Sequence, residues 1–433
     1  MPSRLCMIVP LVLMLSGNVL AYSKQSSVNS VVNNQERVSV TTLEQLLTEL
    51  VKNNPEIRAA QFRFEAATKR PSQVSTLPEP KLTLVNVGVG QPFSSLNVSE
   101  FAYRGIGISQ EIPFPGKLAL AAEEAQREAD SDRQHYRSIV LEKTAQLKTT
   151  YYDWYFVTKA IEITSKNRDL VDRFEQIARA RYSVGKGIQP DVLKAQVEVS
   201  GLAQQLEILE QKRLVTEARI RSLLNSELPL GRPVEIRQTP LALKLESVLQ
   251  MVESQSTRLQ ADQAMVQSRA VGIDRARKEY RPDFNFSVQW QKTGSQFPDY
   301  YMATAEIKLP VYFSRKQRLG VEEAEARLQE ARQNYQATRQ DLVFSAKDKY
   351  FTAMTSEKLL SLFQSGIIPQ SSTALESALS GYEVGNVDFL TLLNNAVTLL
   401  NYEMQYYQEL AKHEQALAEL EPLVGVELTS ARP

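Results

Sequence analysis

The chain has 433 residues, with 50 basic and 50 acidic side chains and therefore no formal net charge. A balanced charge gives no electrostatic footprint for DNA or RNA, which argues against a nucleic-acid-binding protein and for protein and lipid partners. The single cysteine, Cys6, lies near the N-terminus, so the rest of the chain offers neither a disulfide framework nor a thiolate metal site.

Residues 1–21 predict a cleaved secretory signal peptide. The basic Arg4 precedes a short apolar stretch from 5 to 15, and a small residue, Ala21, stands at the expected cleavage point. Neither this stretch nor any later one reaches the roughly 20 apolar residues of a membrane-spanning helix. Residues 22–41 are polar and aperiodic, which indicates an extended leader over the surface. We therefore expect an exported chain that crosses no membrane as a helix.

The remaining chain consists of two related halves. Ile57 to Pro80 has the same length as Leu259 to Pro282, and the two segments lie 202 residues apart. Each half also carries a Tyr-x-Val-Gly sequence with an aspartate soon after it. Such self-similarity predicts one supersecondary unit that occurs twice. We expect the first unit at 42–226, a linker at 227–246, the second unit at 247–425 and a tail at 426–433.

Each repeat predicts long coiled-coil helices. Residues 117–184 contain neither Gly nor Pro, and a helix of that length would extend over about 100 Å. Apolar residues recur every seven positions, as at Val140, Leu147 and Trp154, which is typical of helices that pack side by side. Further helices are expected at 42–76, 190–225, 315–384 and 387–421, the third with a kink at Gly366 and Pro369. The core of an ordinary globular bundle is the alternative for this pattern.

Four strands are expected, two in each repeat. They lie near 81–90, 101–112, 283–291 and 301–310. In the third, Phe284 and Phe286 alternate with polar residues such as Asn285, which predicts one face in lipid and one in a wet lumen. Four strands cannot close a barrel and a bilayer does not tolerate open strand edges, so three copies would have to supply 12 strands. The alternative is a soluble sheet packed on helices.

Two features are specific enough to suggest a family. They are the segment Ile-Ser-Gln-Glu-Ile-Pro-Phe-Pro-Gly-Lys at 108–117 and the paired Tyr-x-Val-Gly turns with their following aspartates. In these features the chain resembles the TolC-like outer-membrane efflux proteins, and within them the heavy-metal branch that includes CzcC and CusC. The resemblance extends from about Thr42 to Gly425.

The fold implied by this resemblance is mainly α with a small β part. Each chain would contribute duplicated long-helix coiled-coil hairpins and four β-strands. Three chains would form a trimeric 12-stranded outer-membrane β-barrel, continued by an α-helical barrel through the periplasm. The linker at 227–246 and the C-terminus would form an equatorial region around the helices.

The resemblance also implies a passive outer-membrane channel of a tripartite efflux system. A homotrimer in outer-membrane lipid would receive its substrate from an inner-membrane RND-type pump through a periplasmic adaptor protein. The branch favours heavy-metal cations as cargo, although no residue identifies the cargo. The alternative is a soluble periplasmic coiled-coil protein with a structural or adaptor role.

An enzyme is a weaker alternative, because no catalytic constellation stands out in the sequence. His135 and His413 are the only histidines, and each is isolated on a predicted helix. A dedicated transition-metal site needs several such ligands close together. We therefore expect no catalytic residue, no bound metal and no cofactor.

The helix turns are the expected functional sites. By the resemblance, the adaptor contacts both turns, and the narrow entrance of the duct follows the second one. The candidate adaptor-contact residues are Tyr182, Val184, Gly185, Val384 and Gly385, and the candidate entrance residues are Asp388, Tyr382 and Asp191. Some relatives have a further aspartate where this chain has Thr391, so we expect one ring of three carboxylates. The alternative for both aspartates is a helix N-cap or a first-turn acid.

Overall fold

The computed structural model describes residues 40–88, 90, 96–97 and 99–428. The expected signal peptide and the leader as far as residue 39 lie outside the described residues, as does the tail from 429 onward. The end of the leader forms β1 (Val40–Thr41), which pairs in parallel with β4 (Arg232–Pro233) of the linker. This short sheet joins the start of the first repeat to the segment between the repeats.

The two repeats contain corresponding elements in the same order. Those of the first repeat are α1 (Leu43–Asn53), α2 (Pro55–Ser75), β2 (Lys81–Val87), β3 (Tyr103–Ile112), α3 (Lys117–Ser183) and α4 (Gln189–Leu224). Those of the second are α5 (Leu245–Gln255), α6 (Thr257–Lys278), β5 (Asp283–Lys292), β6 (Tyr300–Lys308), α7 (Gln317–Leu362), the π-helix η1 (Phe363–Ile367), α8 (Ile368–Val384) and α9 (Phe389–Val424).

A corner interrupts the first helical run. The side-chain oxygen of Asn54 accepts hydrogen bonds from the N–H groups of Glu56 and Ile57, at 2.9 and 3.1 Å, and so caps α2. Pro55 fits the first turn of α2 because no helical partner exists there for an N–H. The expectation of one continuous helix over 42–76 is therefore wrong. The dipeptide Asn54-Pro55 is the local signal that marks the corner.

The long helix of the second repeat changes geometry where Gly366 and Pro369 predicted a kink. In η1 the N–H of Ile368 donates to the carbonyl of Phe363, five residues earlier. α8 then follows with Pro369 in its first turn. A π-helical turn widens the helix locally, so the chain bends there without ending the helix.

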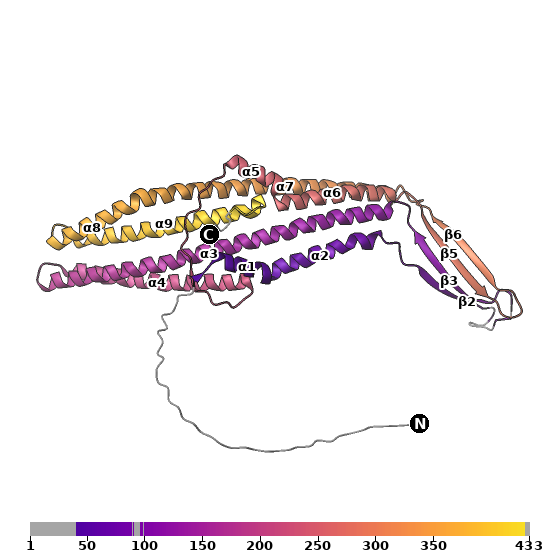
Figure 1. Ribbon diagram of the computed structural model, residues 1–433, viewed down its shortest axis with the longest axis horizontal. Helices are drawn as coiled ribbons and strands as arrows, with labels where there is room; N and C mark the ends of the chain where they lie inside the picture. Colours follow the sequence, from indigo (N-terminus) through magenta and orange to yellow (C-terminus); the bar gives the residue numbers. More distant parts are fainter. Residues whose placement is uncertain (1–39, 89, 91–95, 98, 429–433) are drawn as a thin grey trace, which may run out of the picture. The chain divides into compact units, whose positions relative to one another are not determined.

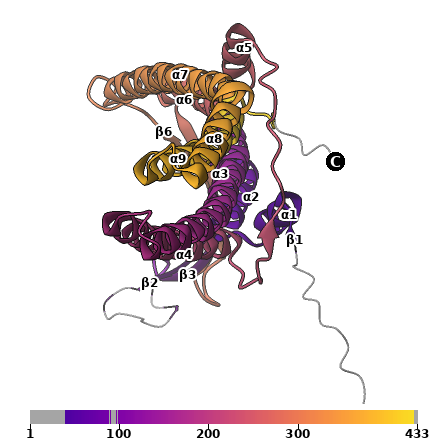
Figure 2. The same ribbon diagram turned by 90° about the vertical axis from the view of Figure 1, so that its left-hand side faces the viewer.

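The helices lie side by side in one curved layer. α3 packs against α2 and α4 on one side and against α6 and α9 on the other, while α7 packs on α6 and α9. Figure 1 shows α2 and α4 end to end along α3, as their lengths suggested. Figure 2 shows the curved row from α4 through α3 and α9 to α7. Within the described ranges, no helix is long and apolar enough to cross a membrane.

The four longer strands form an antiparallel sheet in the order β2-β3-β5-β6. A row of paired residues on one face consists of Leu82, Ile108, Val288 and Ala303. The next row, on the opposite face, consists of Thr83, Gly107, Gln289 and Met302. One face is thus apolar and the other largely polar, as the alternation predicted. β2 ends at Val87 and β3 begins at Tyr103, so both strands are shorter than the expected 81–90 and 101–112; residue 89 lies outside the described residues.

Candidate functional site at the helix turns

Two equivalent turns lie together at the end of the helices that is opposite the sheet (Figure 1). Each turn contains a glycine in the left-handed region, Gly185 at φ 72° and Gly385 at φ 85°. The N–H of Gly185 donates to the carbonyl of Tyr182 at 3.0 Å, and that of Gly385 donates to the carbonyl of Tyr382 at 3.1 Å. These bonds satisfy the last carbonyls of α3 and α8, so each Tyr-x-Val-Gly sequence ends a helix and reverses the chain.

A clasp formed by Arg181 and Tyr382 joins the two hairpins. The guanidinium of Arg181, on α3, lies 4.6 Å from the centroid of the Tyr382 ring and donates a hydrogen bond to the Tyr382 carbonyl on α8. Tyr382 is only 4 % exposed and packs against Phe389, with ring centroids 5.7 Å apart. The clasp therefore fixes one hairpin to the core of the other. Arg181 was not among the expected site residues, because its sequence carries no signal beyond a basic residue near a helix end.

The two aspartates lie close together although they belong to different hairpins. Asp388 caps α9 and accepts hydrogen bonds from the N–H of Thr391 at 2.8 Å and from its hydroxyl at 2.9 Å. These bonds hold the pKa of Asp388 below its usual range. Burial raises the pKa of Asp191, in the first turn of α4, and the charge of Asp388 raises it further, while Arg181 opposes both effects. Asp388 is therefore a helix N-cap, and its role at an entrance stays a prediction.

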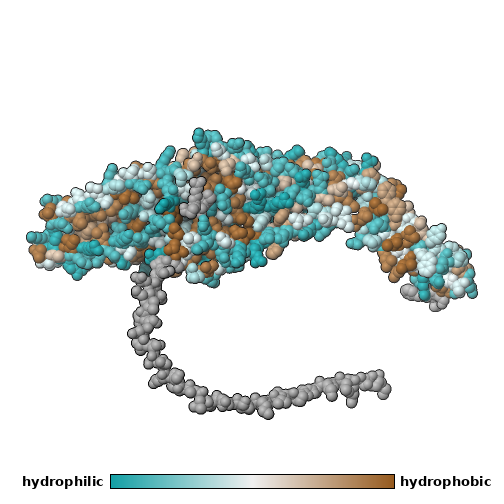
Figure 3. Space-filling model, viewed as in Figure 1, coloured by the Kyte–Doolittle hydropathy of each residue, from teal (hydrophilic) through white to brown (hydrophobic). Residues whose placement is uncertain are grey.

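Apolar side chains project from the turns into solvent. Val184 is 67 % exposed, Val384 71 % and Tyr182 48 %. The hydrophobic surface at this end of the helices is visible in Figure 3. Tyr182 and Tyr382 hold equivalent positions in the repeat but differ in environment, since only Tyr382 is buried. Exposed apolar residues at the tip of a hairpin are available to a protein partner.

A buried polar cluster lies far from the turns, where α9 meets α7 and the linker. The Nδ1 of His413 lies 2.9 Å from the carbonyl oxygen of Ala353, and its Nε2 lies 2.7 Å from that of Thr239. Glu414 accepts hydrogen bonds from the N–H and hydroxyl of Thr239, and burial raises the pKa of Glu414. The cluster fastens the linker to the helices. In the part of the chain that the structure describes, no group of His, Cys, Asp and Glu side chains could hold a metal ion.

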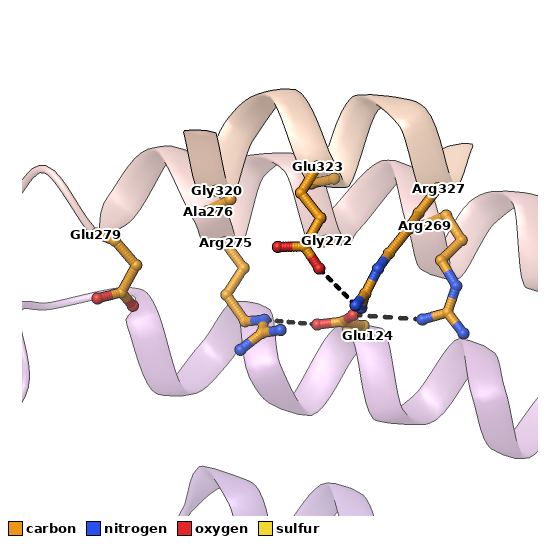
Figure 4. A pocket seen from close by; sticks show the side chains of 10 residues that line it. Glu124, Arg269, Gly272, Arg275, Ala276, Glu279, Gly320, Glu323 and Arg327 are labelled. Carbon is orange, nitrogen blue, oxygen red and sulfur yellow. Dashed lines mark hydrogen bonds and ion pairs between the residues drawn. The ribbon is translucent and has the colours of Figure 1, made fainter. Parts of the chain in front are cut away.

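A charged pocket of about 220 Å³ lies between α3, α6 and α7 (Figure 4). Glu124 pairs with Arg275 at 2.6 Å and with Arg269 at 3.8 Å. Glu323 pairs with Arg327 at 2.5 Å. Glu124 thus joins α3 to the two arginines of α6, while the Glu323–Arg327 pair lies within α7. These ion pairs account for the charged lining, which indicates packing between helices and not a ligand site.

A model of the outer membrane efflux protein family matches residues 46–226 and 248–426. The chain belongs to this family. The two matched segments coincide with the two repeats, and the gap between them coincides with the linker. Membership makes the chain an outer-membrane efflux protein, a transport channel and not an enzyme, so the alternative of a soluble coiled-coil protein is set aside.

Named relatives point in the same direction. The chain is 22 % identical over 404 residues to the cobalt-zinc-cadmium resistance protein CzcC of Cupriavidus metallidurans, which covers 90 % of this chain and 91 % of CzcC. It is 23 % identical over 313 residues to the pyoverdine export outer membrane protein OpmQ of Pseudomonas putida, which covers 69 % of this chain and 65 % of OpmQ. The chain thus spans just under two thirds of OpmQ and nearly all of CzcC.

A solved structure shares the fold. CusC matches with a TM-score of 0.76 and 14 % sequence identity, over 89 % of this chain and 92 % of that one. An identity this low makes the likeness a statement about fold alone. The likeness covers helices and sheet together, so the mainly α architecture with a small β part is confirmed.

Proposed function

We propose that three copies of this chain form one closed duct through the outer membrane and into the periplasm. A 12-stranded barrel crosses the membrane and a barrel of helices continues it. The duct conducts passively what an inner-membrane RND-type pump delivers through a periplasmic adaptor. The observation that carries this proposal is the sheet, which combines an exposed apolar face with two open edges.

The apolar face of the sheet is strongly exposed in the single chain. Leu84 is 75 % exposed, Ile108 56 % and Tyr301 84 %. Lipid is the solvent that such a face fits, while the polar face suits a water-filled lumen. β2 and β6 are the edge strands among the described residues, and unpaired backbone groups are not tolerated in lipid. Both edges therefore need a partner, which further copies of the chain provide.

Both outer helices carry exposed apolar side chains. On α7, Phe344 and Phe351 lie on the face opposite the buried Ala346 and Ala353, and they are 73 % and 46 % exposed. On α4, at the other end of the row of helices, the exposed apolar side chains lie opposite the buried ones in the same way. They are Leu193, Val197, Ile208 and Val215. The edge strand β6 lies on the side of α7, and the edge strand β2 lies on the side of α4 (Figure 2). Each side of one chain can therefore meet the opposite side of the next, which favours a ring with head-to-tail contacts.

The helix turns form the periplasmic end of the proposed duct. Tyr182, Val184 and Val384 present apolar surface to the adaptor, and Gly185 and Gly385 permit the reversals that expose it. The Arg181–Tyr382 clasp holds the two hairpins of each protomer together at the entrance. Asp388 would give a trimer one ring of three carboxylates there, which attracts cations, and Asp191 lies near it in each protomer.

Heavy-metal cations are the cargo that we propose first. CzcC, which carries resistance to cobalt, zinc and cadmium in its name, matches nearly the whole chain. OpmQ, named for pyoverdine export, matches a shorter part. The pump selects the cargo in this scheme, so the duct needs no metal-ligand cluster of its own.

The mass of the detergent-extracted protein, corrected for bound detergent, tests the duct. A trimer in the outer-membrane fraction is expected, because only a closed ring leaves no strand edge in lipid. A detergent-independent monomer in the soluble fraction would refute both the barrel and the duct. A strain that lacks the gene serves as the control for the membrane fraction.

A further inference from the structure

The buried side chain of His413 lies between two carbonyl oxygens. Its Nδ1 is 2.9 Å from the carbonyl oxygen of Ala353, on α7, and its Nε2 is 2.7 Å from that of Thr239, in the linker. Both distances are those of hydrogen bonds. The ring of His413, itself on α9, therefore connects three segments that are far apart in the sequence.

A neutral imidazole cannot make both of these hydrogen bonds. It has an N–H group on one ring nitrogen and a lone pair on the other, and a carbonyl oxygen can only accept. In a neutral ring, one of the two contacts would bring two lone pairs together in a buried place, which is unfavourable. A ring with a proton on each nitrogen donates to both carbonyls.

We propose that His413 is an imidazolium that ties the linker to α7 and α9, and that this tie opens when the ring loses one proton to solvent at higher pH. The neutral ring can then donate to only one carbonyl. Ala353 is held within α7, whereas Thr239 lies in a segment without helical hydrogen bonds, so the contact with Thr239 is the one that opens. The tie lies within one chain and does not depend on the trimeric duct.

Glu414 provides the negative charge beside this cation. Its carboxylate accepts hydrogen bonds from the N–H of Thr239 at 2.7 Å and from the hydroxyl of Thr239 at 2.9 Å. Burial raises the pKa of Glu414, and the charge of His413 opposes that rise. Two consecutive residues of α9 thus hold Thr239, because Glu414 accepts from its donors while His413 donates to its carbonyl. A buried cation needs such a partner.

The other ionisable groups on the surrounding elements make contacts of their own. Ion pairs join Lys412 to Glu409 on α9, Lys148 of α3 to Glu421 of α9, and Lys159 of α3 to Glu235 of the linker. On α7, Glu357 accepts the N–H of Leu241, from the linker. Burial raises the pKa of Tyr152, on α3, which keeps that side chain neutral. Protonation of Glu414 would loosen Thr239 as the pH falls, so loosening as the pH rises is specific to His413.

Nitrogen-15 NMR of the imidazole tests the charge. The chain has two histidines, and the other one, His135, is exposed on α3. His135→Gln therefore leaves His413 as the single labelled histidine in the full chain, purified without a histidine tag and reconstituted in lipid. We expect both ring nitrogens to be protonated at about pH 7, and one of them to lose its proton at higher pH. An unprotonated ring nitrogen at about pH 7 would overturn the proposed charge. A ring that stays doubly protonated up to about pH 10 would overturn the pH-dependent opening.

Tryptic cleavage after Arg237 tests the tie. Arg237 is exposed and lies two residues before Thr239. The parent chain is compared with His413→Leu at each pH, so that the pH dependence of trypsin itself cancels. We expect cleavage about tenfold slower in the parent than in His413→Leu at about pH 7, and rates within about twofold of each other once the ring is neutral.

His135→Leu is the matched control, and its cleavage after Arg237 should equal that of the parent at every pH. Equal rates in the parent and in His413→Leu at about pH 7 would show that the ring does not hold the linker. The NMR measurement leaves residue 413 unchanged, so it determines the charge even if His413→Leu does not fold.

Discussion

Gly425 ends α9 at a point where a side chain has no room. Its φ is 79°, and a Cβ at this position would lie 2.2 Å from the carbonyl oxygen of Gln255, at the corner between α5 and α6. Gly425→Ala should therefore combine backbone strain with a clash against a main-chain atom, and destabilise the fold by about 2–4 kcal/mol. The measurement is the midpoint of thermal unfolding by circular dichroism.

Gly185→Ala is the matched control for this prediction. Gly185 has a similar φ of 72°, but a Cβ at this position would meet no atom of the described residues within 4 Å beyond its own chain neighbours. Strain alone should cost about 1–2 kcal/mol at that site. Equal losses of stability in the two variants would show that the clash with Gln255 adds nothing to the cost of backbone strain.

At the residue scale, the sequence located the candidate site but not its contacts. The paired Tyr-x-Val-Gly motifs predicted both turns, because a glycine in the left-handed region is a local requirement. The environments of Tyr182 and Tyr382 were not predictable, since burial of one and exposure of the other depend on packing between hairpins. Arg181 was missed for the same reason. Its partner is 201 residues away in sequence, and no local pattern reports such a contact.

Among the helices, too, some features were predictable from the sequence and others were not. The helix at 117–184 was predictable because a long run without Gly or Pro has few alternatives, and α3 occupies Lys117–Ser183. The π-helical form of the bend near Gly366 was not predictable, because Gly366 and Pro369 indicate a kink but not its hydrogen-bond pattern. The corner at Asn54 could have been predicted, because a capping residue followed by proline marks the start of a new helix.

The clasp between the hairpins predicts how the entrance responds to mutation. Arg181→Ala removes both the cation–π contact and the hydrogen bond to the Tyr382 carbonyl. We expect the interaction free energy between the two hairpins of each protomer to weaken by about 1–2 kcal/mol. The mean conductance in planar bilayers should then rise at least twofold. Arg179→Ala is the control, because Arg179 pairs with Glu175 on its own helix. An unchanged conductance in Arg181→Ala would mean that the clasp does not restrict the entrance.

For the molecule as a whole, the unpaired strand edges and the exposed apolar faces of the outer helices determine whether a single chain can form the duct. Strand pairing can satisfy the edges of the sheet, but a closed ring also needs the helices to meet. Exposed apolar rows on α7 and α4 lie on the faces that point away from the chain's own core. The assembly should therefore depend on side chains in the periplasmic helices as well as on the barrel.

Phe344→Asp tests this dependence at the most exposed apolar position of α7. A single chain should tolerate the change, because Phe344 is 73 % exposed and packs little within its own protomer. In the trimer the same carboxylate would be buried in an apolar contact without a partner, at a cost of several kcal/mol in each of the three contacts. We therefore expect chains that insert poorly and run as monomers on gels that preserve native trimers. Phe344→Leu keeps an apolar side chain and should assemble normally. Normal trimers in Phe344→Asp would place this face of α7 outside the contact between copies.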